Sequence, residues 1–131
     1  MKKMVIAVGL TCLPAAAIAS ELPGVWSLAA TKNCEAGPAW VFFADGYYAE
    51  VTLPSSDAHA LGIWRDEGKA IAYTHTHMPF AGHDKPMEVK RLTVDDRAAE
   101  RIATKNYRGL PRIFHRCPAS ALKARSGQPA H

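Results

Sequence analysis

The sequence predicts a single all-β domain, an antiparallel barrel of about eight strands. Turn signals recur every eight to twelve residues, apolar and polar residues alternate between them, and no segment carries a long helical stripe. Short strands joined by tight turns are typical of barrels and sandwiches. The strands that we expect are 25–29, 39–43, 47–53, 60–65, 69–78, 87–94, 98–104 and 113–117.

The chain begins with a segment that has the layout of a secretory signal peptide. Two lysines precede an apolar run over residues 4–13, and residues 17–19 (Ala-Ile-Ala) supply the small side chains of a cleavage site. The run is too short to span a bilayer, and a retained anchor is the alternative interpretation. Cleavage after Ala19 leaves 14 Lys and Arg against 12 Asp and Glu, a balance that argues against nucleic acid as a partner. We expect a periplasmic or secreted protein without a membrane span.

The first half of the predicted barrel is marked by aromatic strands and a strong hairpin signal. Residues 39–43 (Ala-Trp-Val-Phe-Phe) run into Asp45-Gly46, which is typical of a two-residue turn. Residues 47–53 then alternate as a half-buried strand should. Asp66-Glu67-Gly68 predicts the next hairpin turn.

The second half is predicted from turn residues and prolines. Asp95-Asp96-Arg97 indicates a third hairpin, and the segment after it, "AAERIATK", contains good helix formers that we assign to a strand because of its neighbours. Pro111 and Pro118 limit a closing strand. The domain is expected over residues 20–118, and residues 119–131 are expected to form a flexible tail.

Cys34 and Cys117 are the two cysteines that remain once the signal peptide, with Cys12, is removed. In an exported domain, two cysteines most simply form one disulfide. This bond would join the start of the domain to its end. A pair of free thiols, or a metal site that uses them, is the alternative.

A set of motifs resembles a known group of proteins. Gly24-Val25-Trp26 recurs as Gly62-Ile63-Trp64, an aromatic strand leads into Asp45-Gly46, and "FHRCP" at residues 114–118 closes the chain. This layout resembles the small exported, lipocalin-like β-barrel proteins of Gram-negative bacteria. The opening "LPGVWSLAATKNC" is loosely similar to periplasmic alkaline-protease inhibitors, which are eight-stranded barrels with a disulfide. In that family the two cysteines lie close together, whereas here they span the domain, so no functional residue is carried over.

Three histidines form a candidate metal site. On a strand, His75 and His77 continue the face of Ile71 and Tyr73, and two imidazoles in this spacing can bind one zinc or copper ion weakly. His83 would supply a third ligand from the following loop. The alternative is a polar strand end with no ion.

Aromatic residues are the candidate lining of a ligand cavity. The interior of an eight-stranded barrel holds either packed side chains or one small ligand, so the same residues could simply fill the core. The candidates are Trp26, Trp40, Phe42, Tyr47, Trp64 and Tyr73.

Charge is distributed unevenly along the chain. Residues 20–84 carry three basic and eight acidic side chains, whereas residues 85–131 carry eleven basic and four acidic ones. The basic half could bind an anionic partner of the cell envelope if its side chains share an outer face. Because antiparallel strands bring early and late segments together, ion pairs between the halves are the simpler explanation.

The sequence favours a non-enzymatic binding module for a small apolar ligand or a cell-envelope partner. No nucleophile motif supports catalysis. The alternative is an inhibitor of a protease or other hydrolase, in which a loop such as 53–59 or 78–86 blocks the enzyme. A third hypothesis is a metal-binding protein built on His75 and His77.

Overall fold

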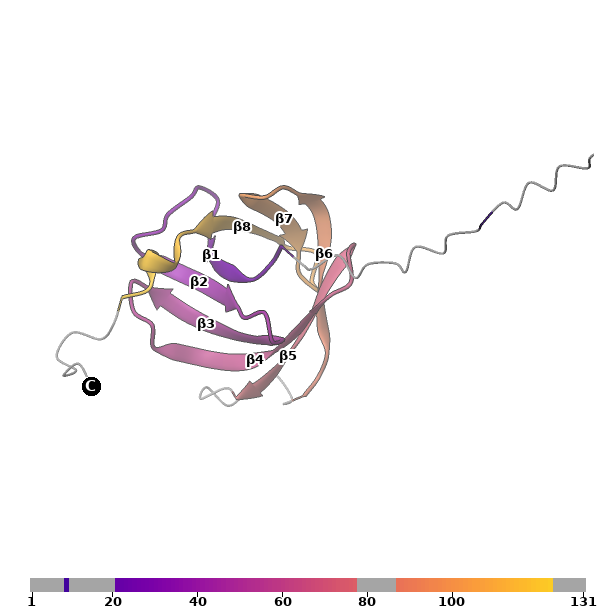
Figure 1. The fold of residues 1–131 in the computed structure, drawn as a ribbon, viewed down its shortest axis with the longest axis horizontal. Helices are drawn as coiled ribbons and strands as arrows, with labels where there is room; N and C mark the ends of the chain where they lie inside the picture. The colour runs from indigo at the N-terminus through magenta and orange to yellow at the C-terminus, as the bar shows by residue number, and fades with distance from the viewer. Residues whose placement is uncertain (1–8, 10–20, 78–86, 124–131) are drawn as a thin grey trace, which may run out of the picture.

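The structure is a computed structural model that describes Gly9 and residues 21–77 and 87–123. Each strand pairs antiparallel with the next along the chain, and the first pairs with the last, so that the sheet closes into one barrel (Figure 1). The predicted fold class, an antiparallel barrel of eight strands, is confirmed. The strands are β1 (Gly24–Leu28), β2 (Gly37–Phe42), β3 (Tyr47–Leu53), β4 (Ala58–Asp66), β5 (Ala70–His77), β6 (Lys90–Arg97), β7 (Arg101–Lys105) and β8 (Pro111–Cys117).

The third hairpin differs most from the prediction. The sequence predicts a turn at 95–97, but β6 continues through these residues and the turn falls at 98–100. The β6–β7 ladder shifts register between Val94 and Asp96, and such a bulge allows a strand to continue past an irregularity. β8 begins earlier than expected, at Pro111, because proline is tolerated as the first residue of a strand.

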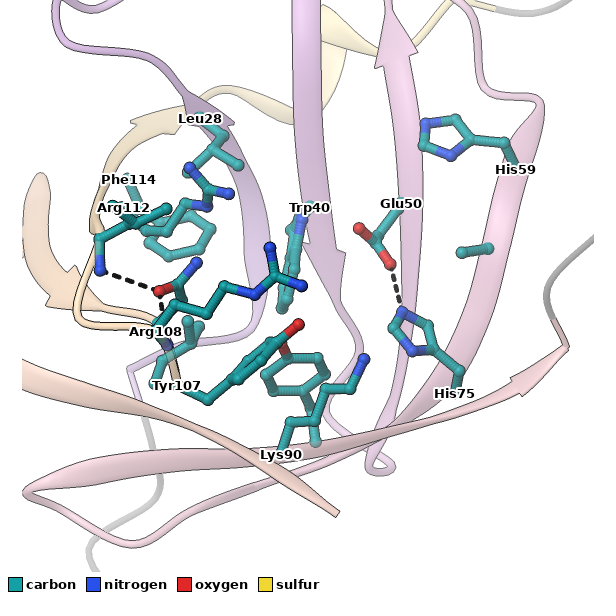
Figure 2. Close-up of a pocket in the computed structure, with 15 residues that line it drawn as sticks. Leu28, Trp40, Glu50, His59, His75, Lys90, Tyr107, Arg108, Arg112 and Phe114 are labelled. Atoms are coloured by element: carbon teal, nitrogen blue, oxygen red, sulfur yellow. Dashed lines mark hydrogen bonds and ion pairs between the residues drawn. The ribbon is translucent and has the colours of Figure 1, made fainter. Parts of the chain in front are cut away.

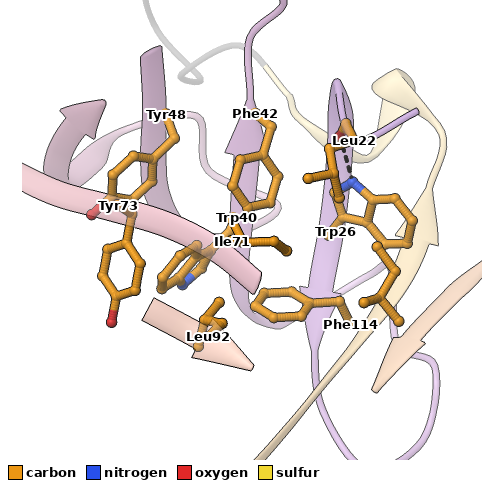
Figure 3. Close-up of a cluster of buried hydrophobic side chains, with 10 residues drawn as sticks. Leu22, Trp26, Trp40, Phe42, Tyr48, Ile71, Tyr73, Leu92 and Phe114 are labelled. Atoms are coloured by element: carbon orange, nitrogen blue, oxygen red, sulfur yellow. Dashed lines mark hydrogen bonds between the residues drawn. The ribbon is translucent and has the colours of Figure 1, made fainter. Parts of the chain in front are cut away.

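A group of buried side chains, most of them aromatic, fills part of the barrel interior (Figure 3). Trp40 stacks on Tyr48 with ring centroids 5.1 Å apart, and it meets Tyr73 and Phe114 edge-on at 5.0 and 5.5 Å. Such ring pairs stabilise the core beyond the effect of burial alone. The interior group consists of Leu22, Trp26, Trp40, Phe42, Tyr48, Ile71, Tyr73, Leu92, Ile102 and Phe114.

A second apolar cluster lies on the outer face of β1 to β3. Successive strand residues point to opposite faces, so Val25 and Val41 belong to this outer cluster while their neighbours Trp26 and Trp40 face the interior. Burial on both faces explains why the aromatic strand reads as a continuous apolar run.

The C-terminal segment and the disulfide cover the outer cluster. Cys34 and Cys117 are bonded, with their Cα atoms 5.6 Å apart, so the predicted disulfide is confirmed. A 3-10 helix, η1 (Ala119–Ala121), follows β8 and buries Ala121 in the cluster. The sequence predicts a flexible tail from residue 119, whereas Ala121 and Leu122 pack on the outer cluster; residues 124–131 lie outside the described part of the chain.

One end of the barrel is closed by the segment before β1. The indole of Trp26 donates to the carbonyl of Leu22 at 2.8 Å, and the guanidinium of Arg116 lies 4.2 Å from the Trp26 ring centre. Arg116 also donates to the carbonyls of Glu21, Pro23 and Ala99, which ties the N-terminal segment and the β6–β7 turn to β8. This end is therefore packed and hydrogen-bonded.

The glycine of each Gly-x-Trp motif lies against a side chain of another strand, where a Cβ atom would not fit. A Cβ at Gly24, whose φ is +139°, would lie 2.7 Å from a guanidinium nitrogen of Arg116. A Cβ at Gly62 would overlap the ring of Tyr48 and the carbonyl of Thr74. The glycines thus serve close packing, which is the reason that a strand interior accepts them.

Ion pairs on the outer surface join the acidic first half of the chain to its basic second half. Arg97 binds Asp66 at 2.7 Å and Arg91 binds Glu67 at 2.8 Å. Hydrogen bonds, first from Arg91 and then from Arg65, hold the pKa of the Glu67 carboxyl below its ordinary value. These contacts favour the simpler of the two explanations for the uneven charge.

Removing the disulfide should destabilise the domain strongly. The bond closes a loop with a sequence separation of 83 residues, and loss of a native disulfide from a small exported domain costs about 2–5 kcal/mol. We expect the Cys34→Ser/Cys117→Ser variant to lose that much free energy of unfolding in a urea titration. The oxidised parent protein without residues 1–19, and hence without Cys12, should show no free thiol when unfolded without reductant, and two reactive thiols would contradict the bond.

Replacing Tyr48 with phenylalanine should stabilise the protein. Its hydroxyl is buried without a hydrogen-bond partner among the described residues, and such a group costs about 1–3 kcal/mol. Burial, with smaller effects of Glu50 and Tyr73, raises the pKa of Tyr48 well above its ordinary value of 10.0. We expect Tyr48→Phe to increase the free energy of unfolding by about 1 kcal/mol at neutral pH.

The pH dependence gives a second readout of the same variant. Above pH 10 the unfolded state can ionise Tyr48 whereas the folded state cannot, so ionisation favours the unfolded state. The free energy of unfolding is therefore unaffected by this group below pH 10 and falls as the pH rises further. Above pH 10 the Tyr48→Phe variant should therefore lose less free energy of unfolding than the parent protein. Equal alkaline loss in both proteins, measured by urea titration, would show that the buried phenol is not its source.

Candidate functional site

A cavity of about 470 Å³ opens at the end of the barrel opposite the Arg116 closure. It is lined by the last residue of β1, the first residues of β4, β6 and β8, and the β7–β8 loop. In an antiparallel barrel these strand ends all meet at one rim, whereas Gly24, Arg116 and the 98–100 turn lie at the other. As far as the described residues show, the barrel is therefore closed at one end and open at the other.

The floor and inner wall of the cavity are apolar. Trp40, Tyr73, Leu92 and Phe114 come from four strands and belong both to the interior group and to the cavity lining. Leu28 and Ala60 extend this surface toward the rim. The aromatic group thus fills the closed half of the barrel and forms the base of the open half.

The rim is cationic on one side. Lys90, Arg108 and Arg112 line the cavity together with Tyr107. The Lys90 ammonium and the Arg108 guanidinium lie 5.5 and 5.4 Å from the Tyr107 ring centre. Figure 2 shows the two arginines on one side of the cavity and a Glu50–His75 pair on the other, with Trp40 between them.

A hydrogen-bonded loop holds Tyr107 and Arg108 at the rim. The side-chain oxygen of Asn106 accepts the backbone N–H groups of Arg108 and Leu110 at 3.0 and 2.9 Å. Backbone bonds from Asn106 to Leu110 and from Gly109 to Asn106 close the turn, and Gly109 supplies the positive φ of +76°. The loop is pre-organised by its own residues.

Glu50 and His75 form a pair in the cavity wall. Their side chains are 20% and 10% exposed, and Glu50 Oε2 lies 2.7 Å from His75 Nε2. Glu50 faces inward because it stands opposite Trp40 in the β2–β3 register. One oxygen of the carboxylate is thereby engaged by the imidazole.

Five of the six aromatic residues predicted to line a cavity divide into three groups. Trp40 and Tyr73 line the open cavity, whereas Trp26 and Phe42 are core residues of the closed half. Trp64 is half-buried, donates to Phe43 O at 3.0 Å, and lines a separate depression of about 160 Å³.

Tyr47 corrects the prediction most clearly. It is 59% exposed and does not line either cavity, because β3 directs its neighbour Tyr48 inward. Successive tyrosines must face opposite sides of a strand, and the sequence did not reveal which of the two faces the interior.

The histidines predicted to bind a metal lie in different environments. His75 is buried in the cavity wall, His77 is exposed at the end of β5, and His83 lies outside the described residues. A register shift in the β4–β5 ladder between Leu61 and Gly62 falls opposite Thr76 and separates the two. Within the described residues no group of three or more His, Cys, Asp or Glu side chains is arranged to hold an ion, and a zinc or copper site stays a prediction.

The loops considered for an inhibitor are only partly described. Residues 53–59 form a short connection, because β4 already begins at Ala58, and Ser55 pairs with Lys123 beyond η1. Residues 78–86 lie outside the described part of the chain. Inhibition of a hydrolase therefore remains a prediction from the sequence.

Several cavity residues were not singled out from the sequence. Glu50 and Lys90 belong to no recognisable motif, and Tyr107 lies in a loop to which the sequence assigns no role. Arg108 and Arg112 were noticed only as part of the basic half of the chain. The "NYRGLPR" run at 106–112, with its turn residues between two strands, is the one signal that could have placed cations and an aromatic ring at a barrel rim.

Comparison of the chain with protein-family models, curated proteins and solved structures finds no match. Among the described residues, no helix has the length and apolar character needed to cross a membrane. The functional argument therefore rests on the geometry of the cavity.

The side chains of Glu50 and His75 should be energetically coupled. Their contact is largely buried, and hydrogen bonds to charged groups contribute about 1.5–3 kcal/mol. A double-mutant cycle with Glu50→Gln and His75→Gln, followed by urea unfolding, should give a coupling energy in that range. The exposed Arg65–Glu67 pair is the matched control and should give a much smaller coupling energy, because solvent screens exposed pairs. Equal coupling in the two cycles would contradict the assigned contact.

Proposed function

We propose that this protein is an exported, non-enzymatic binding module that takes a small apolar molecule into the open end of its barrel. The observation that carries the proposal is the cavity of about 470 Å³ with a floor of aromatic and aliphatic side chains. Small-molecule sites are concave, mostly apolar and about 300–1,000 Å³ in volume.

The rigidity of the cavity supports a binding role. Trp40, Leu92 and Phe114 are fixed by strand pairing and by contacts within the interior group, so an incoming ligand need not order them. A ligand that covers this floor removes apolar surface from water at about 25 cal/mol per Å². The closed end prevents the cavity from becoming a channel and gives the ligand one entrance.

Export fits the same proposal. The N-terminal segment has the layout of a signal peptide, and the Cys34–Cys117 bond is of the kind that forms in oxidising compartments such as the periplasm. A periplasmic or secreted location would place the module where apolar molecules need a carrier through water. A cell-envelope protein that receives or supplies the ligand is the partner that this role implies.

A neutral fluorescent probe tests the proposal. Nile red brightens in an apolar site, and we expect saturable binding of one probe per chain that dodecanol displaces. Tyr107→Ala removes an exposed ring from the cavity rim and should weaken binding about tenfold, or about 1.4 kcal/mol.

The matched control is Tyr47→Ala. Tyr47 and Tyr107 are 59% and 57% exposed, but Tyr47 lies outside the cavity, so its removal should leave the affinity unchanged. Absence of saturable binding, or equal loss in both variants, would contradict a ligand site at this end of the barrel.

A further inference from the structure

We infer that the ligand is amphipathic and anionic: its carboxylate or phosphate group binds Arg108 and Arg112 at the rim, with Lys90 beside them, while its apolar body lies on the Trp40 floor. This inference rests on the proposed binding function and deepens it by naming the chemical class of the ligand.

The charges that line the cavity are unbalanced. Among the described residues that line the cavity, Arg108 and Arg112 are accompanied by one carboxylate, Glu50, which hydrogen-bonds to His75. Arg108 and Arg112 have no carboxylate partner in the described part of the chain, whereas Arg91 and Arg97 on the outer surface are both paired. The cavity thus presents two guanidinium groups to whatever enters it.

The Tyr107 ring concentrates positive charge. The Lys90 ammonium and the Arg108 guanidinium both lie within 5.5 Å of its centre, where the ring attracts each of them. The ring thus holds the Arg108 guanidinium at the rim of the cavity, where an entering anion can meet it.

The cations are also positioned in advance. Asn106 fixes the backbone of Arg108, and the Thr104 hydroxyl donates to the carbonyl of Arg112 at 2.8 Å within the β7–β8 pair. A planar guanidinium can offer two parallel N–H bonds to the oxygens of a carboxylate or phosphate. The backbone anchors reduce the ordering that this contact requires.

The arrangement of the site separates the two parts of the ligand. In Figure 2 the arginines lie on one side of Trp40 and the paired Glu50 and His75 on the other. An anionic group is attracted to the arginine side, while the apolar body covers the ring between the two sides. This division matches a molecule with one charged end.

Three ligands with the same alkyl tail test the inference by isothermal titration calorimetry: dodecanoate, dodecyl phosphate and dodecanol, each below its aggregation limit. We expect at least one of the two anions to bind about tenfold or more tightly than dodecanol. Arg108→Gln and Arg112→Gln should each weaken binding of that anion about tenfold and leave the affinity for dodecanol unchanged. Comparison of the two anions distinguishes a carboxylate from a phosphate ligand.

Arg101→Gln is the control for net charge. Arg101 is exposed on β7 and does not line the cavity, so its loss should alter none of the affinities. Equal affinity for dodecanol and both anions, with no effect of Arg108→Gln or Arg112→Gln, would overturn the anionic inference and leave the binding function intact. Failure of all three ligands and of Nile red to bind would overturn both.

Discussion

The position of the Trp40 ring determines how the inside of this barrel is used. Trp40 contacts Phe42, Tyr48, Tyr73 and Phe114 at centroid distances of 5.0 to 5.9 Å, and it also forms the floor of the open cavity. Below it the interior is filled to the Arg116 closure. Above it lies the cavity lined by the described residues of the rim. A barrel that is packed in one half and open in the other needs a rigid boundary, and the aromatic contacts of this ring provide it.

The two ends of the barrel use arginine for opposite purposes. Arg116 at the closed end satisfies its guanidinium with backbone carbonyls and the Trp26 ring, so this charge is used in holding the fold together. Among the described residues, Arg108 at the open end contacts the Tyr107 ring, and neither Arg108 nor Arg112 has its guanidinium bound to a carbonyl or a carboxylate. The same residue type thus closes one end and marks the other as a binding surface. The difference lies in the segment before β1, which covers the Arg116 end.

The fold could be predicted from the sequence because its signals are local. Asp45-Gly46 and Asp66-Glu67-Gly68 each mark a turn between neighbouring strands, and within the expected domain Cys34 and Cys117 each have one possible partner. The site could not be predicted in the same way. Glu50 meets His75 and Lys90 meets Tyr107 only because the paired strands bring them together, and no spacing in the chain encodes those contacts. Register also decided which of two adjacent tyrosines faces inward, and a bulge separated His75 from His77.

The central claim is that a ligand enters the open half and stops at Trp40, and the three indole N–H signals of an NMR spectrum test it most directly. The chain has three tryptophans, and the other two donate to Leu22 O and Phe43 O away from the cavity. Titration with dodecanol or dodecanoate, with signals assigned by Trp→Phe substitution, should shift the Trp40 signal and leave those of Trp26 and Trp64 in place. A shift of Trp26 or Trp64 without a shift of Trp40 would contradict the account.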